Sequence, residues 1–519
     1  MSLQRIAHSP WLPYAVLVAA CLAAYSNIYD NVFLFDDFTL IKNNKFLTHW
    51  GSIGQIFTSS TTAGSGGHDR FYRPLQIFSY LLLAQAFGVA LIPYHLFNVA
   101  LHCLNTCLGF CLGLKLGFRR NAAFAAMLLW GLHPLHTEAV TYMSGSADML
   151  AALFILLGLI SLTSWTAKRA AFACLCFILA LLSKESAVIF PLLAMSLLFL
   201  QSDSRWSWRT YKKTWIFWCI ALVYFALKLL ALYSSNGQGL YHPDAVYDQN
   251  FLHRLYTFLA SLTSYASLLL IPRHLHMKRE FAVYVDLLIP RVIGGAILCL
   301  LMAAIVFLRP RQKATPLAWG VFWFAAAFLP TSGLFLAVNG IFYEHWMYLP
   351  SLGLILGLAA TIDRALDQTP SYRTPLALAV AGLACLFAIL TFNQNKIWRE
   401  PLVFYSNMIA DGSRAPEAHT NLGTYYYDKG DLDHAAEQFQ IAIRNSPGYA
   451  PPYYDLAITR LRQDTSPASL EKIKNDLQKA IALNPDFLAP YPVLADLYAA
   501  TGDPEKAAYY RKLSTPPQP

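Results

Sequence analysis

The sequence has few charged residues for its length. Only 13% of its 519 residues are Asp, Glu, Lys or Arg, against about 25% in a typical soluble domain, while 56% are hydrophobic. This scarcity excludes a chain surrounded by water along its whole length. The formal net charge is +9, but the basic residues lie in short loops between apolar runs, which indicates membrane orientation and anionic lipid rather than nucleic acid.

Cysteine patterns that bind metal or form disulfides are also missing. No CxxC pair and no Cys/His spacing typical of zinc occurs, and the region after residue 394 has no cysteine. All nine cysteines lie in or beside apolar runs, and Cys103, Cys107 and Cys111 share one helical face. We therefore expect them to act as small residues that pack between membrane helices.

Long apolar runs, by contrast, fill most of the chain up to residue 394. A bilayer core requires about 20 apolar residues per helix, and twelve runs approach this length. They lie near 11–29, 94–114, 121–134, 148–165, 170–183, 186–200, 214–233, 255–271, 292–308, 315–332, 347–362 and 375–393. We predict an all-α, polytopic membrane domain over 1–394 with about eleven spans, in which the first run is a retained span.

Basic clusters in the loops set the expected orientation, because such clusters stay inside. They are Lys115/Arg119/Arg120, Lys168/Arg169, Arg205/Arg209/Lys212/Lys213, Arg309/Arg311/Lys313 and Arg364/Arg373. Only one full crossing fits between the end of the first span and the first cluster. We therefore expect 30–93 to form a long external loop, with 75–92 along the membrane surface. By the same parity, 255–271 is either interfacial or paired with the apolar piece at 281–290.

With this orientation, the polar residues at the ends of the runs gather on the external side. They are Asp36, Asp37, Tyr72, Arg73, His133, His136, Glu138, Asp148, Lys184, Glu185, Glu344 and His345. Charged side chains at membrane depth are costly and mark functional sites, so this segregation predicts an external polar site. A separate set recurs on one face of a span, where we expect hydrogen bonds between helices. This set is His95, Asn98, His102 and Asn105.

The composition changes after Arg414, from apolar to mixed polar with helical periodicity. Leu456 follows Leu422 by 34 residues, and the middle repeat holds about four extra residues near 464–470. A period of 34 residues, with small residues at helix crossings and proline at the repeat end, is the tetratricopeptide signature.

The repeats define the predicted C-terminal architecture. We expect a linker helix at 395–414 and a soluble α-solenoid of about three repeats at 415–519. Such a domain binds a peptide or protein in its concave face. The alternative is a stabilising cap or an oligomer contact.

Two adjacent acids, Asp36 and Asp37, follow the first span directly and are flanked by aromatic residues. Charges in this position are costly unless they are used or paired. One acid can serve as general base for an acceptor hydroxyl while the apolar wall tunes its pKa. The alternatives are a solvated loop start and a helix N-cap.

Several short motifs resemble those of the membrane O-mannosyltransferase family with C-terminal tetratricopeptide repeats. They are Phe35-Asp36-Asp37, Tyr72-Arg73-Pro74-Leu75, His133-Pro134-Leu135-His136-Thr137-Glu138-Ala139-Val140, Ser144-Gly145-Ser146-Ala147-Asp148, Ser183-Lys184-Glu185 and Glu344-His345-Trp346-Met347-Tyr348-Leu349-Pro350. Their order and the trailing repeats extend the resemblance over nearly the whole chain. That family looks like a branch of the C-type glycosyltransferase (GT-C) fold. Its members use polyprenyl-phosphate sugars, and the first external loop carries the catalytic acid.

The resemblance implies roles for individual residues. Asp36 is the catalytic base, and Asp37 assists it or orients the acceptor. Arg73 meets the donor phosphate, for which arginine is well shaped, and Lys184 and His345 are further phosphate candidates. The family's usual Glu-Arg is Glu344-His345 in this chain. The residues expected to support the site are Tyr72, His133, His136, Glu138, Asp148, Glu185 and Glu344. For Glu185 the alternative is a local ion pair with Lys184.

His133 and His136 are spaced i, i+3 at a helix end, with Glu138 close by. A metal site is one interpretation, but no third ligand has the expected spacing and Pro134 interrupts the helix. We expect hydrogen-bonding support of the site or contact with the acceptor instead, and no cofactor besides the lipid-phosphate sugar as substrate.

Three hypotheses for the function follow. The first is an inverting glycosyltransferase that moves a sugar from a polyprenyl-phosphate carrier to Ser or Thr hydroxyls of envelope or secreted proteins, with the repeats recruiting the polypeptide. The second keeps this chemistry but uses a lipid or surface-glycan acceptor. The third is a non-catalytic membrane scaffold. Short loops are typical of a bacterial protein, so we expect the inner membrane, with the site and the repeats on the periplasmic side.

Overall fold

The structure, a computed structural model, describes residues 9–67, 71–202, 211–234, 247, 250–277, 279, 281–308, 313–335 and 340–514. This part of the chain contains helices and no β-strand, which confirms the predicted all-α class. The chain forms two compact units. Met1–Met277 and Phe281–Arg399 make up the first, and Lys278–Glu280 with Glu400–Pro519 make up the second.

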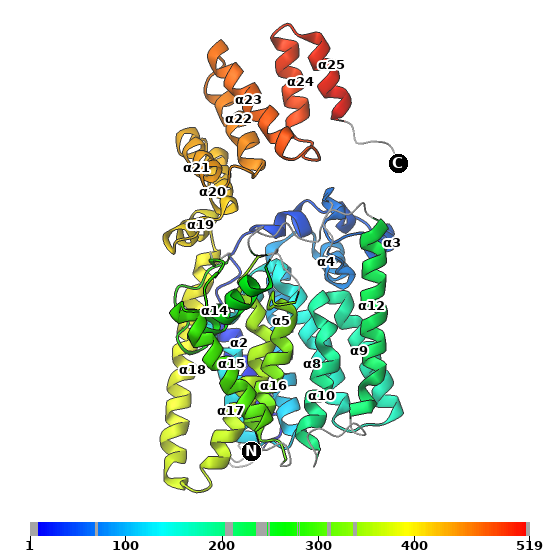
Figure 1. Cartoon of the computed structure of the whole chain (residues 1–519), viewed down its shortest axis with the longest axis vertical. Helices are drawn as coiled ribbons and strands as arrows, with labels where there is room; N and C mark the ends of the chain where they lie inside the picture. The colour runs from blue at the N-terminus through cyan, green and yellow to red at the C-terminus, as the bar shows by residue number, and fades with distance from the viewer. Residues whose placement is uncertain are drawn as a thin grey trace. The chain divides into compact units, whose positions relative to one another are not determined.

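The first unit is a bundle of long helices (Figure 1). They are α2 (Leu12–Ala24), α4 (Pro74–Phe87), α5 (Leu91–Lys115), α6 (Arg120–Gly131), α8 (Ser146–Leu162), α9 (Ala167–Ser183), α10 (Phe190–Gln201), α12 (Trp215–Ser234), α14 (Phe251–Leu270), α15 (Pro290–Phe307), α16 (Pro316–Phe328), α17 (Tyr348–Ala365) and α18 (Arg373–Asn395). Each of the twelve predicted apolar runs forms one of these helices, and α4 lies in the predicted external loop. The sequence pattern therefore located the helices of this unit correctly.

Six helical segments of the described chain are long and apolar enough to cross a membrane. They are Leu91–Lys115, Met143–Leu162, Lys212–Leu230, Pro290–Phe307, Glu344–Ala365 and Pro370–Trp398. Four shorter apolar helices, Leu12–Ala24, Pro74–Phe87, Glu185–Gln201 and Pro316–Thr331, accompany them. The protein is a multi-pass membrane protein, and the count of eleven spans stays a prediction. Residues 281–289 form no helix, so they cannot supply a second crossing beside α14.

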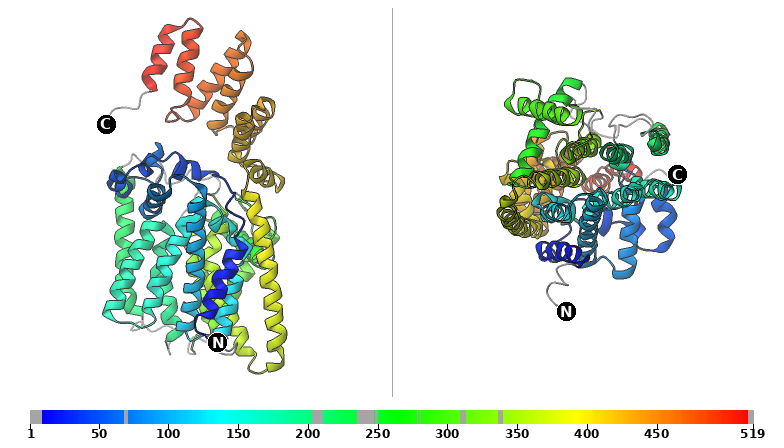
Figure 2. Two further views of the ribbon diagram at one scale, coloured as in Figure 1. Left: turned by 180° about the vertical axis from the view of Figure 1, so that it is seen from behind. Right: turned by 90° about the horizontal axis from the view of Figure 1, so that it is seen from below.

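The two ends of the bundle differ in their side chains. At one end, Arg119 and Arg373 both donate to the carboxylate of Asp367, over 2.6–2.7 Å. At the other end, where α2, α6 and α18 finish, lie the predicted site residues. The left view of Figure 2 shows the long helices of the bundle running between these two ends. The basic loops and the candidate site thus occupy opposite ends. The predicted basic residues Arg205, Arg209, Arg309 and Arg311 lie outside the described residues.

Polar side chains on one face of α5 tie the bundle together. His95 approaches the Asn31 carbonyl at 3.1 Å, and Asn98 donates to the carbonyls of Val140 and Tyr142. The other two members of the set, His102 and Asn105, both approach the hydroxyl of Tyr348 in α17. The prediction that this face makes hydrogen bonds between helices is confirmed, and each bond satisfies a polar group that burial would otherwise leave costly.

The second unit consists of helix pairs. They are preceded by α19 (Pro401–Ala410) and comprise α20 (Pro416–Asp428) with α21 (Leu432–Asn445), α22 (Pro451–Gln463) with α23 (Pro467–Leu483), and α24 (Pro490–Ala500) with α25 (Pro504–Leu513). Buried alanines stand at the crossings, where a larger side chain would separate the helices. They include Ala435, Ala442, Ala457, Ala480 and Ala495. The predicted tetratricopeptide-type region is confirmed in its helical form.

The Gly-Asp dipeptide explains two of the turns in these pairs. Gly430 and Gly502 have φ of +82° and +83°, a left-handed conformation that glycine adopts without steric cost. The following acids, Asp431 and Asp503, cap the next helix by accepting a backbone N–H. The middle pair uses Ser466 as its cap instead, and its second helix has 17 residues against 14 in α21. The extra residues of the middle repeat therefore lengthen a helix.

Candidate active site

The two adjacent acids after α2 have different surroundings. Asp37 is 1% exposed, and its carboxylate accepts three hydrogen bonds. Leu34 N–H donates to Oδ2 over 3.0 Å, while the N–H and the hydroxyl of Ser144 donate to Oδ1 over 2.8 and 2.6 Å. Asp37 thus fastens the loop that follows α2 to the segment that precedes α8.

Asp36 is exposed, and its own backbone N–H donates to the hydroxyl of Tyr142 over 2.8 Å. The residue before it, Phe35, has φ of +45°, a conformation that is uncommon for any residue with a side chain. This turn precedes both acids, of which Asp36 is open to solvent and Asp37 is enclosed.

Burial of Asp37 also changes its chemistry. Desolvation raises the pKa of this carboxyl to about 7, although the hydrogen bonds from Ser144 and Leu34 act in the opposite direction. The nearby charge of Asp36 adds to the rise. Asp37 therefore changes its protonation state close to neutral pH, while its hydrogen-bond donors remain in place.

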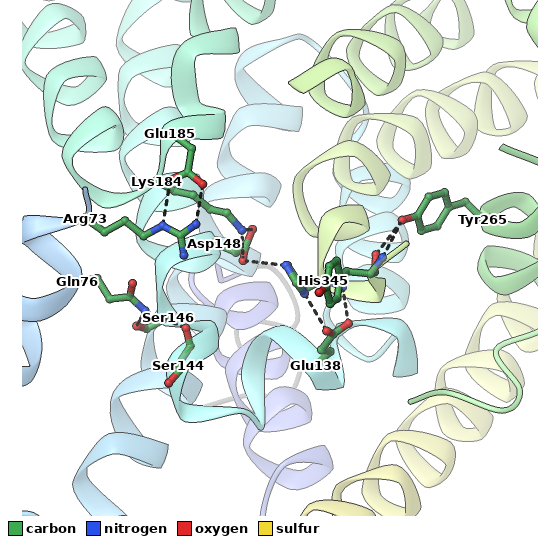
Figure 3. A network of polar contacts seen from close by, with 11 residues as sticks. Arg73, Gln76, Glu138, Ser144, Ser146, Asp148, Lys184, Glu185, Tyr265 and His345 are labelled. Carbon is green, nitrogen blue, oxygen red and sulfur yellow. Dashed lines mark hydrogen bonds and ion pairs between the residues drawn. The ribbon is translucent and has the colours of Figure 1, made fainter. Parts of the chain in front are cut away.

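Two bidentate ion pairs lie beside the 144–148 segment (Figure 3). Arg73, which precedes α4, donates through Nε and Nη2 to Glu185 over 3.0 and 2.6 Å. Lys184 Nζ lies 2.7 Å from both carboxylate oxygens of Asp148. The alternative of a local ion pair between Glu185 and Lys184 is wrong, because the two neighbours bind partners on different elements.

His345 extends this row of ion pairs. Its Nδ1 lies 2.9 Å from Glu138 Oε1, its backbone N–H donates to Glu138 Oε2 over 3.0 Å, and its Nε2 lies 3.9 Å from Asp148 Oδ2 (Figure 3). The preceding Glu344 is buried and accepts from the N–H of His276 over 2.9 Å. His345 therefore stands beside the Lys184–Asp148 pair, which is compatible with its predicted phosphate role.

The acid side and the basic side of the site are only a few residues apart. Ser144 holds Asp37, and Asp148 holds Lys184. Residues 143–145 form a short helix that leads directly into α8, so Ser144 and Asp148 are separated by about 6 Å of helix rise. The sequence-predicted carboxylates and cations are thus joined through one turn of backbone.

Three predicted supporting residues lie outside this row of ion pairs. Tyr72 donates its hydroxyl to the Phe57 carbonyl, within the external loop. His133 approaches the Leu269 carbonyl at 3.0 Å, and His136 approaches the Ser351 hydroxyl at 3.3 Å. In the part of the chain that the structure describes, no group of three His, Cys, Asp or Glu side chains is arranged to hold a metal ion.

A small cavity opens beside the Lys184–Asp148 pair. Asp148 forms part of its wall, and most of the remaining lining is apolar. The apolar lining includes Ala151, Ile155, Ile189, Trp346 and Pro350. The wall of this small cavity thus combines one carboxylate with apolar side chains.

Sequence reasoning gave no role to several residues of the site. Gln76 of α4 donates to the Ser144 carbonyl over 2.8 Å, and Ser144 itself holds Asp37. Lys228 of α12 is close enough to Glu185 and Arg73 for its charge to act on both. Lys228 had a signal in the sequence, because it is a lone cation inside an apolar run. Ser144 stood in the 144–148 motif but was given no role, and Gln76 had no signal, since a polar side chain of ordinary type is common at helix ends.

Comparisons with known proteins agree with the resemblance. The chain matches no protein-family model. A protein O-mannosyl-transferase of Caenorhabditis elegans is 24% identical over 445 residues, which cover 84% of this chain and 63% of that protein. Protein O-mannosyl-transferase TMTC1 of Homo sapiens is 24% identical over 526 residues, which cover 88% of this chain and 57% of that protein. The chain therefore spans 57–63% of the length of these two curated relatives.

Among solved structures, the chain is similar to ArnT from Cupriavidus metallidurans bound to undecaprenyl phosphate. The TM-score is 0.38 with 14% sequence identity, and the match covers 98% of this chain and 76% of that chain. The predicted resemblance to the O-mannosyltransferase family is confirmed by the curated relatives.

Proposed function

We propose that this protein is a membrane glycosyltransferase that moves a sugar from a polyprenyl-phosphate carrier to an acceptor hydroxyl with inversion. The observation that carries the proposal is the exposed carboxylate of Asp36 on a loop that Asp37 fastens to the Ser144–Asp148 turn, next to the cations Arg73 and Lys184. The relatedness to protein O-mannosyl-transferases supports the same reaction class.

The proposed reaction is a single displacement. Asp36 accepts the proton of the acceptor hydroxyl, whose oxygen attacks the anomeric carbon from the face opposite the phosphate. The bond between that carbon and the phosphate oxygen breaks, and the electron pair leaves with the carrier phosphate. Arg73, Lys184 and His345 stabilise the negative charge that develops on the phosphate, each such contact contributing about 3–4 kcal/mol to lowering the barrier.

The remaining predicted residues hold these groups in place. Asp37 anchors the loop that carries Asp36, while Glu185, Asp148 and Glu138 orient Arg73, Lys184 and His345. A preorganised site of this kind has its dipoles and charges set before the reaction begins, so little energy is spent on reorganisation.

For the acceptor we propose Ser or Thr hydroxyls of envelope or secreted proteins. The helical repeats of the second unit support a polypeptide, since such domains bind extended peptides in their concave face. The proposed location is the inner membrane of a bacterium, with the site on the periplasmic side, because the basic loops lie at the end of the bundle opposite the site.

The experiment that tests this function compares envelope proteins from cells with and without the gene, and from cells that express Asp36→Asn. We expect a hexose-sized mass increase on acceptor proteins only with the wild-type gene, and a loss of transfer of at least about a hundredfold in the variant. Asp30→Asn is the matched control, because Asp30 is exposed in the same loop and contacts only the exposed Arg399 at 3.4 Å among the ion pairs described. Full transfer by Asp36→Asn would remove the proposed base.

A further inference from the structure

The last turn of α18 is bonded to the start of the first external loop. The side chain of Asn395 is fully buried and donates from Nδ2 to the Ala24 carbonyl and to Asn27 Oδ1, both over 3.0 Å. In return, Asn31 Nδ2 donates to the Asn395 carbonyl over 3.2 Å, and Asn27 Nδ2 donates to the Phe392 carbonyl over 2.7 Å. Residues 24–31, which lead to Asp36, and the last turn of α18 thus each donate hydrogen bonds to the other.

The same asparagine also holds the segment that binds the two acids. Thr141 donates its hydroxyl to Asn395 Oδ1 over 2.8 Å. The next residue, Tyr142, accepts the backbone N–H of Asp36, and Ser144 follows with its two hydrogen bonds to Asp37. The carbonyl oxygen and both N–H groups of the Asn395 side chain are therefore hydrogen-bonded. They join the segment after α2, which carries Asp36, to the segment that contains Thr141 and Tyr142.

A ring contact continues this connection toward the end of the first unit. Trp398 is 3% exposed, and its ring stacks on that of Tyr142 with centroids 5.6 Å apart and an interplanar angle of 30°. Arg399 is the last residue of the first unit, and the helix α19 of the second unit begins at Pro401. The residues that position the Asp36 loop are therefore covalently next to the repeat domain.

We propose that Asn395 and Trp398, close to the C-terminal end of the first unit, are positioning residues for the Asp36 carboxylate. This inference rests on the proposed function for its kinetic consequence. Asn395→Asp keeps the size of the side chain but replaces the donating amide by an oxygen that faces the Ala24 carbonyl and Asn27 Oδ1. A buried contact between two oxygen atoms without a hydrogen between them is unfavourable, so the last turn of α18 should separate from the segment that leads to Asp36.

The test uses the full chain in detergent or nanodiscs, with two measurements. Hydrogen exchange reports on residues 27–44 and 139–146, and steady-state transfer from a polyprenyl-phosphate sugar reports turnover and the donor KM. Asn395→Asp and Thr141→Val each remove part of the same hydrogen-bonded junction from opposite sides. Asn393→Asp is the matched control, because Asn393 is exposed two residues earlier in α18. Trp398→Phe retains a stacking ring, whereas Trp398→Ala removes it.

We expect Asn395→Asp, Thr141→Val and Trp398→Ala to raise exchange in both segments and to lower turnover at least about tenfold, since small displacements of a reacting group are costly. The donor KM should change less than about twofold, because the cations that bind phosphate are held elsewhere. Asn393→Asp and Trp398→Phe should match the wild type.

Two outcomes separate this inference from the proposed function. If the wild type transfers no sugar but the exchange pattern is as expected, the proposed function fails and the junction between Asn395 and the Asp36 loop stands. If Asn395→Asp and Thr141→Val behave like Asn393→Asp in exchange and turnover, the inference is overturned. If either Asn395→Asp or Thr141→Val does not fold, the remaining variant still tests the inference, since each removes hydrogen bonds of Asn395 independently.

Discussion

Two neighbouring acids can have different surroundings when one of them is bonded to a second segment of the chain. Asp36 faces solvent, whereas Asp37 is enclosed and accepts hydrogen bonds from Leu34 and Ser144. In the proposed reaction Asp36 is the base and Asp37 anchors its loop, so single substitutions at the two positions should fail in different ways.

The first prediction concerns Asp37 and pH. Its pKa is about 7 in the folded protein against 3.8 for the ordinary carboxyl, so the native state retains a proton that the unfolded chain has released between these values. The free energy of unfolding should therefore fall as pH rises from about 4 and level off about one unit above pH 7, with a decrease of about 2–3 kcal/mol between pH 5 and pH 7. Asp37→Asn should lose this dependence.

Melting curves of the wild type, Asp37→Asn and Asp30→Asn between pH 5 and pH 8 check this expectation. Asp30→Asn should retain the pH dependence of the wild type. Identical pH dependence in the wild type and Asp37→Asn would show that the buried carboxyl does not titrate in this range.

The second prediction concerns the arginine of the basic side. Arg73→Lys keeps the charge but cannot form the bidentate contact that Arg73 makes with Glu185, and it presents a point charge to phosphate. We expect the donor KM to rise about tenfold, which corresponds to about 1.4 kcal/mol of binding. Steady-state kinetics with Arg291→Lys as control, an exposed arginine that contacts Tyr284, measures the difference. An unchanged donor KM would remove Arg73 from the phosphate site.

At the scale of elements, the segment between α6 and α8 organises the site. It contains Glu138 and Ser144, and it leads into the first turn of α8, which carries Asp148. The segment is folded into short helical turns rather than one continuous helix. Its compactness depends on Gly145, where a Cβ would lie 2.4 Å from the Ala139 carbonyl oxygen and 3.0 Å from the Glu138 carbonyl oxygen. Backbone atoms cannot give way as a flexible side chain can, so this position requires glycine.

The third prediction follows from this contact. Gly145→Ala should destabilise the protein by about 1–3 kcal/mol and lower activity, because the segment must move to admit the methyl group. Gly382→Ala in α18 is the matched control, since no atom lies within 4 Å of the position of its Cβ, and alanine there should be neutral or stabilising. Thermal unfolding and transfer assays of the two variants check both expectations, and equal behaviour would contradict the close packing at Gly145.

The elements were predictable from the sequence to a greater extent than their contacts. Runs of apolar residues have only one low-cost conformation in a bilayer, so each predicted run forms a helix. The partners of the charged side chains could not be predicted in the same way, because they depend on which helix ends lie next to each other in the fold. Glu138 binds His345, more than two hundred positions away, and Glu185 binds Arg73 instead of its neighbour Lys184. Nothing in the local pattern around Glu185 or Asn395 indicates these partners.

At the scale of the whole molecule, the chain combines a membrane unit and a unit of helical repeats. The two have separate cores, since the buried clusters around Phe439 and Leu477 contain only residues of the second unit. Such a division allows the catalytic chemistry and the choice of acceptor to be assigned to different parts of the chain.

The fourth prediction tests that division. Deleting 415–519 should lower transfer to protein acceptors at least about tenfold while hydrolysis or transfer to a small soluble acceptor continues, because affinity gained through a tethered binding module is lost. Mass spectrometry of envelope proteins and an assay with a short hydroxyl acceptor measure the two activities. Unaltered modification of proteins by the truncated chain would favour the lipid or glycan acceptor.

The pairing of Arg73, Lys184 and His345 with carboxylates affects how inactivating mutations are interpreted. Removing Glu138, Asp148 or Glu185 leaves His345, Lys184 or Arg73 without its carboxylate partner in a poorly hydrated environment. The basic side chain will then bind another anion or change its position. Loss of activity in such a variant is therefore no proof that the missing acid meets the sugar. The double variant Arg73→Glu with Glu185→Arg distinguishes a structural role from a role in phosphate binding. It keeps the ion pair but moves the positive charge to position 185, so restored folding without restored turnover would show that the phosphate requires the arginine at position 73.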